Sequence, residues 1–289
     1  MRLLLRRITT VALAALVAFA ITAIGQALWG VMVSVNLKVS PAIPWAALMM
    51  PFVLAGLVAF LAGRSWPHWG ADARRALVPL APVPAQAWIW AIVSGAVGIA
   101  VLAAFWTVAA RIVRVPPNLL TDLSGVPIWT QAAFLLVAIA AAPLTEEIAF
   151  RGYAMGILRR EFGPAGVLVL SSLMFAAAHL TQGLVAPKLI VYLLVGLGLG
   201  AIVMRTGSLL PAMVVHSMGD LAFFTLVWSQ DAHRRLISQG GADAGFYATV
   251  AILVVGLPIW VVTWRRFLKA TRKDARTGPP SINDSLATA

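Results

Sequence analysis

The sequence lacks cysteine altogether and has few charged residues for its length. Without cysteine there is no disulfide framework, no thiol nucleophile and no thiolate metal site. Only 11% of the 289 residues are charged, whereas 61% are hydrophobic and the mean hydropathy is +0.91. These values exclude a soluble globular protein, because such a protein could not bury so much apolar surface.

Acidic residues are the scarcer charged class, with 10 Asp and Glu against 22 Lys and Arg and a net charge of +12. A net positive charge of this size is typical of proteins that bind nucleic acid. The basic residues, however, stand in short clusters between long uncharged runs instead of forming one basic face. This pattern excludes nucleic acid and indicates that the main partner is a lipid bilayer.

Uncharged stretches of about 20 residues, the length that crosses roughly 30 Å of hydrocarbon, recur along the chain. The predicted spans are 8–29, 43–63, 87–110, 128–157, 164–182, 187–205, 208–229 and 246–268. The apolar run after Arg7 is longer than that of a signal peptide, so we interpret it as a retained first helix. The fold class is therefore all-α, a polytopic membrane protein with about eight transmembrane helices.

Lys and Arg residues are concentrated on the side of the membrane where the chain begins, which predicts that both termini are cytoplasmic in the cell membrane. We expect residues 1–268 to form one integral membrane domain. Residues 269–289, which contain Gly278-Pro279-Pro280, are predicted to be a flexible cytoplasmic tail.

A few ionisable residues interrupt the apolar spans. They are Glu146, Glu147, Arg151, His179, His216 and Asp220. Each buried charge costs about 2.5 to 3.5 kcal/mol at the bilayer centre, so these groups should pair or line a wet cavity. Four of them, on three different spans, lie about 12 to 22 Å from the cytoplasmic side at a rise of about 1.5 Å per residue. They are Glu146, His179, His216 and Asp220. The sequence therefore predicts an intramembrane polar cavity.

The spacing within the spans suggests which side chains meet. Glu147 and Arg151 are four residues apart, as are His216 and Asp220, so each pair shares a helix face. A purely structural interpretation is also open, since Glu147 and Arg151 can form a buried ion pair, and membrane histidines often donate one interhelical hydrogen bond.

The chemistry that this set supports is hydrolysis. A carboxylate and an imidazole can activate a water molecule, while a second imidazole binds the developing oxyanion. Glu146, His179, His216 and Asp220 also form a candidate site for a divalent metal, with zinc as the candidate. No GxSxG, HExxH or P-loop pattern is present, so serine hydrolases, zincins and nucleotide-driven pumps lack support.

Three short motifs lie in order on separate apolar segments within about residues 128–229. Residues 146–151 read EExxxR, residues 175–179 read FxxxH, and residues 216–220 read HxxxD. Together they resemble the motifs of the CAAX prenyl endopeptidase and bacteriocin-processing family, also called Abi or type II CAAX protease-like, whose third motif is of the HxxxN/B type. Outside this stretch the resemblance is one of general hydropathy.

The resemblance implies an intramembrane endopeptidase that cuts near the carboxyl end of lipidated or membrane-associated peptides. By it, Glu146 and His179 would activate water, and His216 and Asp220 would form the oxyanion or metal side. Both a metal-assisted and a metal-free mechanism stay open.

The resemblance also implies that Glu147 and Arg151 support the first glutamate. Asp220 departs from the prenyl protease pattern, in which asparagine is usual. Because an ionised carboxylate has no proton to donate, this departure favours metal ligation or a protonated Asp220 over simple oxyanion donation.

Two other classes of function fit the same residues. Intramembrane acids and histidines build proton relays in transporters, and Pro143, three residues before Glu146, could break its helix as in discontinuous transporter helices. A catalytically silent binding or immunity protein is the other alternative. Glycines in two spans are interpreted as close helix contacts, namely Gly152, Gly156, Gly196, Gly198 and Gly200.

Overall fold

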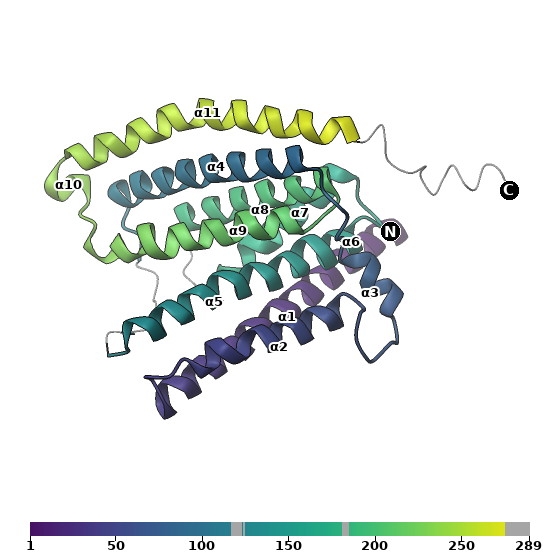
Figure 1. Ribbon diagram of the computed structural model, residues 1–289. Helices are drawn as coiled ribbons and strands as arrows, with labels where there is room; N and C mark the ends of the chain where they lie inside the picture. Colours follow the sequence, from purple (N-terminus) through teal and green to yellow (C-terminus); the bar gives the residue numbers. More distant parts are fainter. Residues whose placement is uncertain (117–122, 124, 181–184, 275–289) are drawn as a thin grey trace.

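The computed structural model describes residues 1–116, 123, 125–180 and 185–274, and these residues form helices joined by short connections (Figure 1). Among these described residues, six helical stretches are long and apolar enough to cross a membrane: Arg2–Val39, Ala85–Ile112, Ile128–Leu158, Ala186–Thr206, Leu210–Asp231 and Ala244–Arg272. Two shorter apolar helices are Trp45–Leu61 and Pro164–Ala178. The prediction of an all-α, multi-pass membrane protein is confirmed.

The helices follow the order of the predicted spans. They are α1 (Arg2–Val39), α2 (Trp45–Leu61), α3 (Ala71–Leu77), α4 (Ala85–Ile112), α5 (Ile128–Glu146), α6 (Met155–Leu158), α7 (Pro164–Ala178), α8 (Ala186–Thr206), α9 (Leu210–Ala222), α10 (Ile237–Gly240) and α11 (Ala244–Asp274). The amino terminus and the carboxyl end of α11 lie at the same end of the bundle (Figure 1). This placement agrees with an even number of crossings.

Several predicted boundaries differ from the structure, and α1 runs over Arg2–Val39 instead of 8–29. Two further differences concern the site and the tail. α7 ends at Ala178, so His179 caps the helix instead of lying inside it. α11 continues to Asp274, six residues into the predicted tail, because Phe267 and Ala270 are buried and keep its last turns packed on the protein. The remainder of the predicted tail, residues 275–289, lies outside the described residues.

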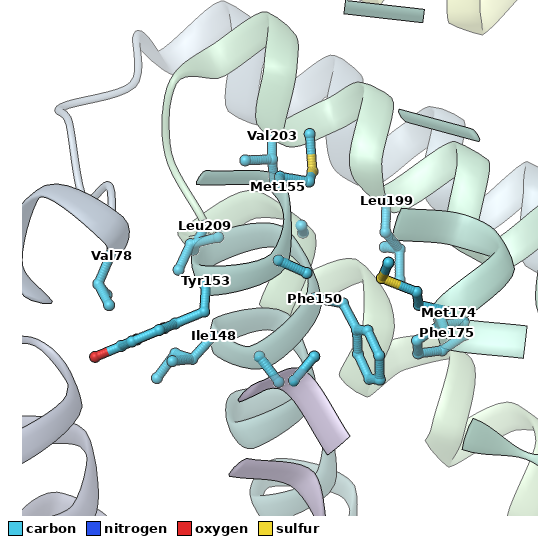
Figure 2. Packing of buried hydrophobic residues seen from close by; sticks show 14 of the residues in the cluster. Val78, Ile148, Phe150, Tyr153, Met155, Met174, Phe175, Leu199, Val203 and Leu209 are labelled. Atoms are coloured by element: carbon cyan, nitrogen blue, oxygen red, sulfur yellow. The ribbon is translucent and has the colours of Figure 1, made fainter. Parts of the chain in front are cut away.

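The span that carries the two adjacent glutamates is not a uniform α-helix. Between α5 and α6, residues Glu147–Ala154 form a π-helix, η1, and all eight are buried. Figure 2 shows Ile148, Phe150 and Tyr153 projecting from this segment into the core. Pro143 lies inside α5 and the helix continues past it, so the helix break considered for the transporter alternative does not occur at Pro143. The local feature that suggested a transporter is therefore absent.

Neighbouring helices approach closely where α8 carries glycine. A Cβ on Gly196 would lie 2.9 Å from Cβ of Ser172, and one on Gly200 would lie 2.6 Å from Leu168, both on α7. Contacts this short are possible only without a side chain. The predicted contact surface is confirmed at these two positions, and it fixes α8 against α7.

Of the other predicted glycine contacts, those at Gly152 and Gly156 are present and the one at Gly198 is not. A Cβ on Gly152 would lie 2.7 Å from the carbonyl oxygen of Leu77, and one on Gly156 would lie 2.3 Å from the Leu77 side chain. Both positions therefore dock η1 and α6 on the end of α3. At Gly198 a Cβ would have open space around it, so the predicted contact is wrong there.

Candidate active site

Glu147 and Arg151 form a buried ion pair at the centre of the bundle. Their side chains are 0% and 1% exposed, and Arg151 Nη1 donates to Glu147 Oε1 over 2.8 Å. Arg151 Nη2 also donates to the carbonyl oxygen of Gly196, and its guanidinium carbon lies 4.4 Å from the centre of the Phe175 ring. The predicted contact four residues apart is present, and it ties η1 to α7 and α8.

His216 on α9 lies between the two glutamates. Its Nδ1 is 2.9 Å from Glu147 Oε1, and its Nε2 is 3.8 Å from Glu146 Oε2 and 3.7 Å from Asp220 Oδ1. A carboxylate only accepts hydrogen bonds, so Nδ1 carries the proton that points to Glu147. The other nitrogen faces two carboxyl groups, each slightly beyond hydrogen-bond distance.

His179 takes its position from the end of α7. Its Nδ1 lies 2.8 Å from the carbonyl oxygen of Phe175, which can only accept, so this nitrogen donates. The ring stacks on Tyr192 with centroids 3.9 Å apart and an interplanar angle of 20°. Phe175 separates the two histidines, with its ring centre 4.8 Å from His179 and 5.7 Å from His216. Both imidazoles are therefore held in fixed orientations.

Comparison with protein families bears directly on this geometry. Residues 128–222 match the family described as "Type II CAAX prenyl endopeptidase Rce1-like". Over this segment the chain is similar to that family. The match confirms the resemblance suggested by the three motifs, and it spans every candidate site residue from Glu146 to Asp220. No curated protein and no solved structure gives a significant match to the chain.

The Rce1-like segment does not supply the whole site. Gln26 on α1 donates from Nε2 to Glu146 Oε1 over 3.3 Å. The sequence motifs do not include Gln26, although an amide within an apolar span is itself a signal of a polar partner. They do not include Tyr192 either, since a tyrosine in a helix has no distinctive spacing from the histidine on which it stacks.

A cavity of about 1530 Å³ lies beside these groups. Glu146, His179, His216 and Asp220 line it, together with Gln26, and most of the remaining wall is apolar. The predicted intramembrane cavity is therefore present, and four of the six candidate residues border it. The Glu147–Arg151 pair lies behind this wall and can act only through its neighbours.

Glu146, His179, His216 and Asp220 also form the predicted metal set. Zinc ligand atoms lie about 2.0 to 2.2 Å from one common point. Within the described part of the chain, no group of three or more His, Asp or Glu side chains is arranged in this way. Metal binding by this set therefore stays a prediction.

Proposed function

We propose that the protein is an intramembrane endopeptidase that hydrolyses a peptide bond in a lipidated or membrane-associated peptide. The observation that carries the proposal is the placement of Glu146 Oε2 and His216 Nε2, 3.8 Å apart, at the wall of a large apolar cavity. Similarity of the Rce1-like segment to a family of endopeptidases supports the same reaction class.

In the proposed reaction Glu146 takes a proton from a water molecule. His179, with its proton on Nδ1, accepts a hydrogen bond at Nε2 from the other O–H of that water, which the oxygen keeps, and so orients it. The oxygen attacks the carbonyl carbon of the scissile bond, and the carbonyl oxygen becomes an oxyanion. When the C–N bond breaks, Glu146 delivers its proton to the departing amine, which restores the carboxylate.

The oxyanion is assigned to the side of His216 and Asp220. His216 in its imidazolium form donates from Nε2, while Glu147 holds the ring through Nδ1. Arg151 in turn holds Glu147. The buried pair is thus a positioning device for the imidazole, and it does not touch the substrate.

The cavity suggests the class of substrate. Its volume exceeds the roughly 300 to 1,000 Å³ of ordinary ligand pockets, and its walls are mostly apolar. Such a space fits a lipid chain or an apolar peptide segment. The family description names prenyl endopeptidases, and a peptide carrying an isoprenoid chain is one substrate that would use this volume.

The test uses purified protein in lipid vesicles with fluorogenic peptides, one with and one without an isoprenoid chain. Glu146→Ala and His179→Ala should each lower the hydrolysis rate by about 100- to 10,000-fold, the usual cost of losing a positioned acid–base group. Membrane insertion should not change. Asp72→Asn, at a carboxyl that is 97% exposed, is the matched control. Hydrolysis by Glu146→Ala at the native rate would refute the assignment.

A comparison of membrane extracts would find the natural substrate. Cells carrying the native chain or Glu146→Ala should differ in the peptides retained in their membranes, and mass spectrometry identifies the species that accumulate with the variant. Identical peptide profiles would count against an endopeptidase role in those cells.

A further inference from the structure

Gln26 lies outside the segment that matches the endopeptidase family, yet it contacts the central carboxylate. The matched segment begins at residue 128, whereas Gln26 lies on α1 and lines the cavity beside Glu146. The amide Nε2 donates to Oε1 of Glu146 over 3.3 Å, while Oε2 of the same carboxyl faces His216. The two oxygens of Glu146 therefore have different partners on different helices.

A close contact one residue earlier puts the amide within reach. A Cβ on Gly25 would lie 2.8 Å from Cγ2 of Thr145, the residue before Glu146. The Thr145 hydroxyl donates to the carbonyl oxygens of Ala141 and Ala142, which fixes the direction of its methyl group. α1 can lie against α5 at this level only because residue 25 has no side chain. The neighbouring amide is then beside the glutamate.

We propose that Gln26 is a positioning residue for Glu146 and that α1 thereby completes the active site of the Rce1-like segment. The inference rests on the proposed function. One anchored oxygen limits rotation of the carboxylate and keeps the other oxygen directed at the water and the imidazole. Orientation of this kind acts on the chemical step, so it should affect kcat more than KM.

The first test replaces the amide by an apolar group of similar size. Gln26→Leu should lower kcat about 10-fold, the loss of a modest hydrogen bond to a charged group, and should leave KM within about 2-fold. Gln131→Leu is the matched control, because its amide donates to carbonyl oxygens of Leu123 and Val126 at the other end of α5. An unchanged kcat in Gln26→Leu overturns the proposal.

The second test moves the helix and leaves the amide in place. Gly25→Ala should push α1 away from α5 and lower kcat about as much as Gln26→Leu does. Adding Thr145→Ser removes the obstructing methyl group and retains the hydroxyl, so the double variant should recover most of the lost kcat. Thr145→Ser alone shows the effect of the smaller side chain. If the double variant is no faster than Gly25→Ala, the contact between Gly25 and Thr145 does not position Gln26 as proposed.

A stability measurement separates this proposal from the proposed function. Gln26→Leu, Glu146→Gln and the variant that combines these two substitutions are compared by thermal unfolding in detergent. If the side chains interact, the shifts in Tm should fail to add by about 2 °C. Additive shifts overturn the Gln26 contact whatever the activity. A native protein that hydrolyses no tested peptide, with shifts that do not add, refutes only the peptidase assignment.

Discussion

Removal of the negative charge at Glu147 should be among the most damaging single changes to stability. Glu147→Gln keeps an oxygen that can accept from Arg151 and His216, but it leaves the guanidinium charge without its counter-charge. The two side chains are 0% and 1% exposed. Breaking a buried ion pair from one side costs about 3 to 5 kcal/mol, because the remaining charge stays buried.

The magnitude can be compared with two other variants. Replacing both partners, as in Glu147→Gln with Arg151→Met, removes the uncompensated charge and should recover most of the lost stability. The exposed pair of Asp72 and Arg75, with side chains 97% and 59% exposed, is the control, and Asp72→Asn should change the free energy of unfolding by less than about 1 kcal/mol. Only the buried site should show a large effect.

Thermal unfolding in detergent, together with the peptide assay, measures both consequences. For a chain of this size about 3 to 5 kcal/mol corresponds to a fall in Tm on the order of 10 °C. The double variant should unfold near the native temperature but hydrolyse peptide slowly, since His216 has lost the carboxylate that holds Nδ1. If Glu147→Gln is as stable as the native protein, or the double variant is no more stable than the single one, the reasoning about buried charge is wrong.

Three further predictions concern topology, the oxyanion side and helix packing. Tags placed after Lys38 should be accessible from outside the cell, and tags after Arg160 and Arg272 only from the cytoplasm; an external tag at Arg272 would contradict an even number of crossings. Asp220→Asn should retain peptide hydrolysis, because the asparagine amide can donate to the oxyanion whereas an ionised carboxylate cannot; loss of activity together with loss of a bound metal would indicate metal ligation by Asp220 instead. Gly152→Ala should lower the free energy of unfolding by about 1 to 3 kcal/mol against the Leu77 carbonyl, as followed by thermal unfolding, whereas Gly198→Ala, with open space around it, should not.

The sequence was sufficient to predict much of the site. Apolar runs set the spans, and spacings of four residues correctly paired Glu147 with Arg151. What it could not provide was the identity of contacts between distant helices. Gln26 belongs to no motif, and its meeting with Glu146 depends on the Gly25 contact, which only the packed bundle reveals.

The local helix geometry also could not be predicted from the sequence. Residues 147–154 have compositions compatible with an α-helix, and their π-helical hydrogen bonding depends on how they are packed. His179 was predicted within a span, but α7 ends one residue before it. Helix ends of this kind depend on the start of the next connection, and single-sequence patterns do not resolve them.

The π-helical segment restricts the insertions and deletions that this span can tolerate. Each residue of an α-helix advances the helix face by about 100°, and a π-helical turn takes in an extra residue. Before the segment, Glu146 faces the cavity; within it, Gly152 meets the Leu77 carbonyl. Deleting one residue between these positions would rotate one half of the span against the other by about 100°. Insertions and deletions between Glu146 and Gly152 should therefore be tolerated less well than substitutions that change hydrophobicity.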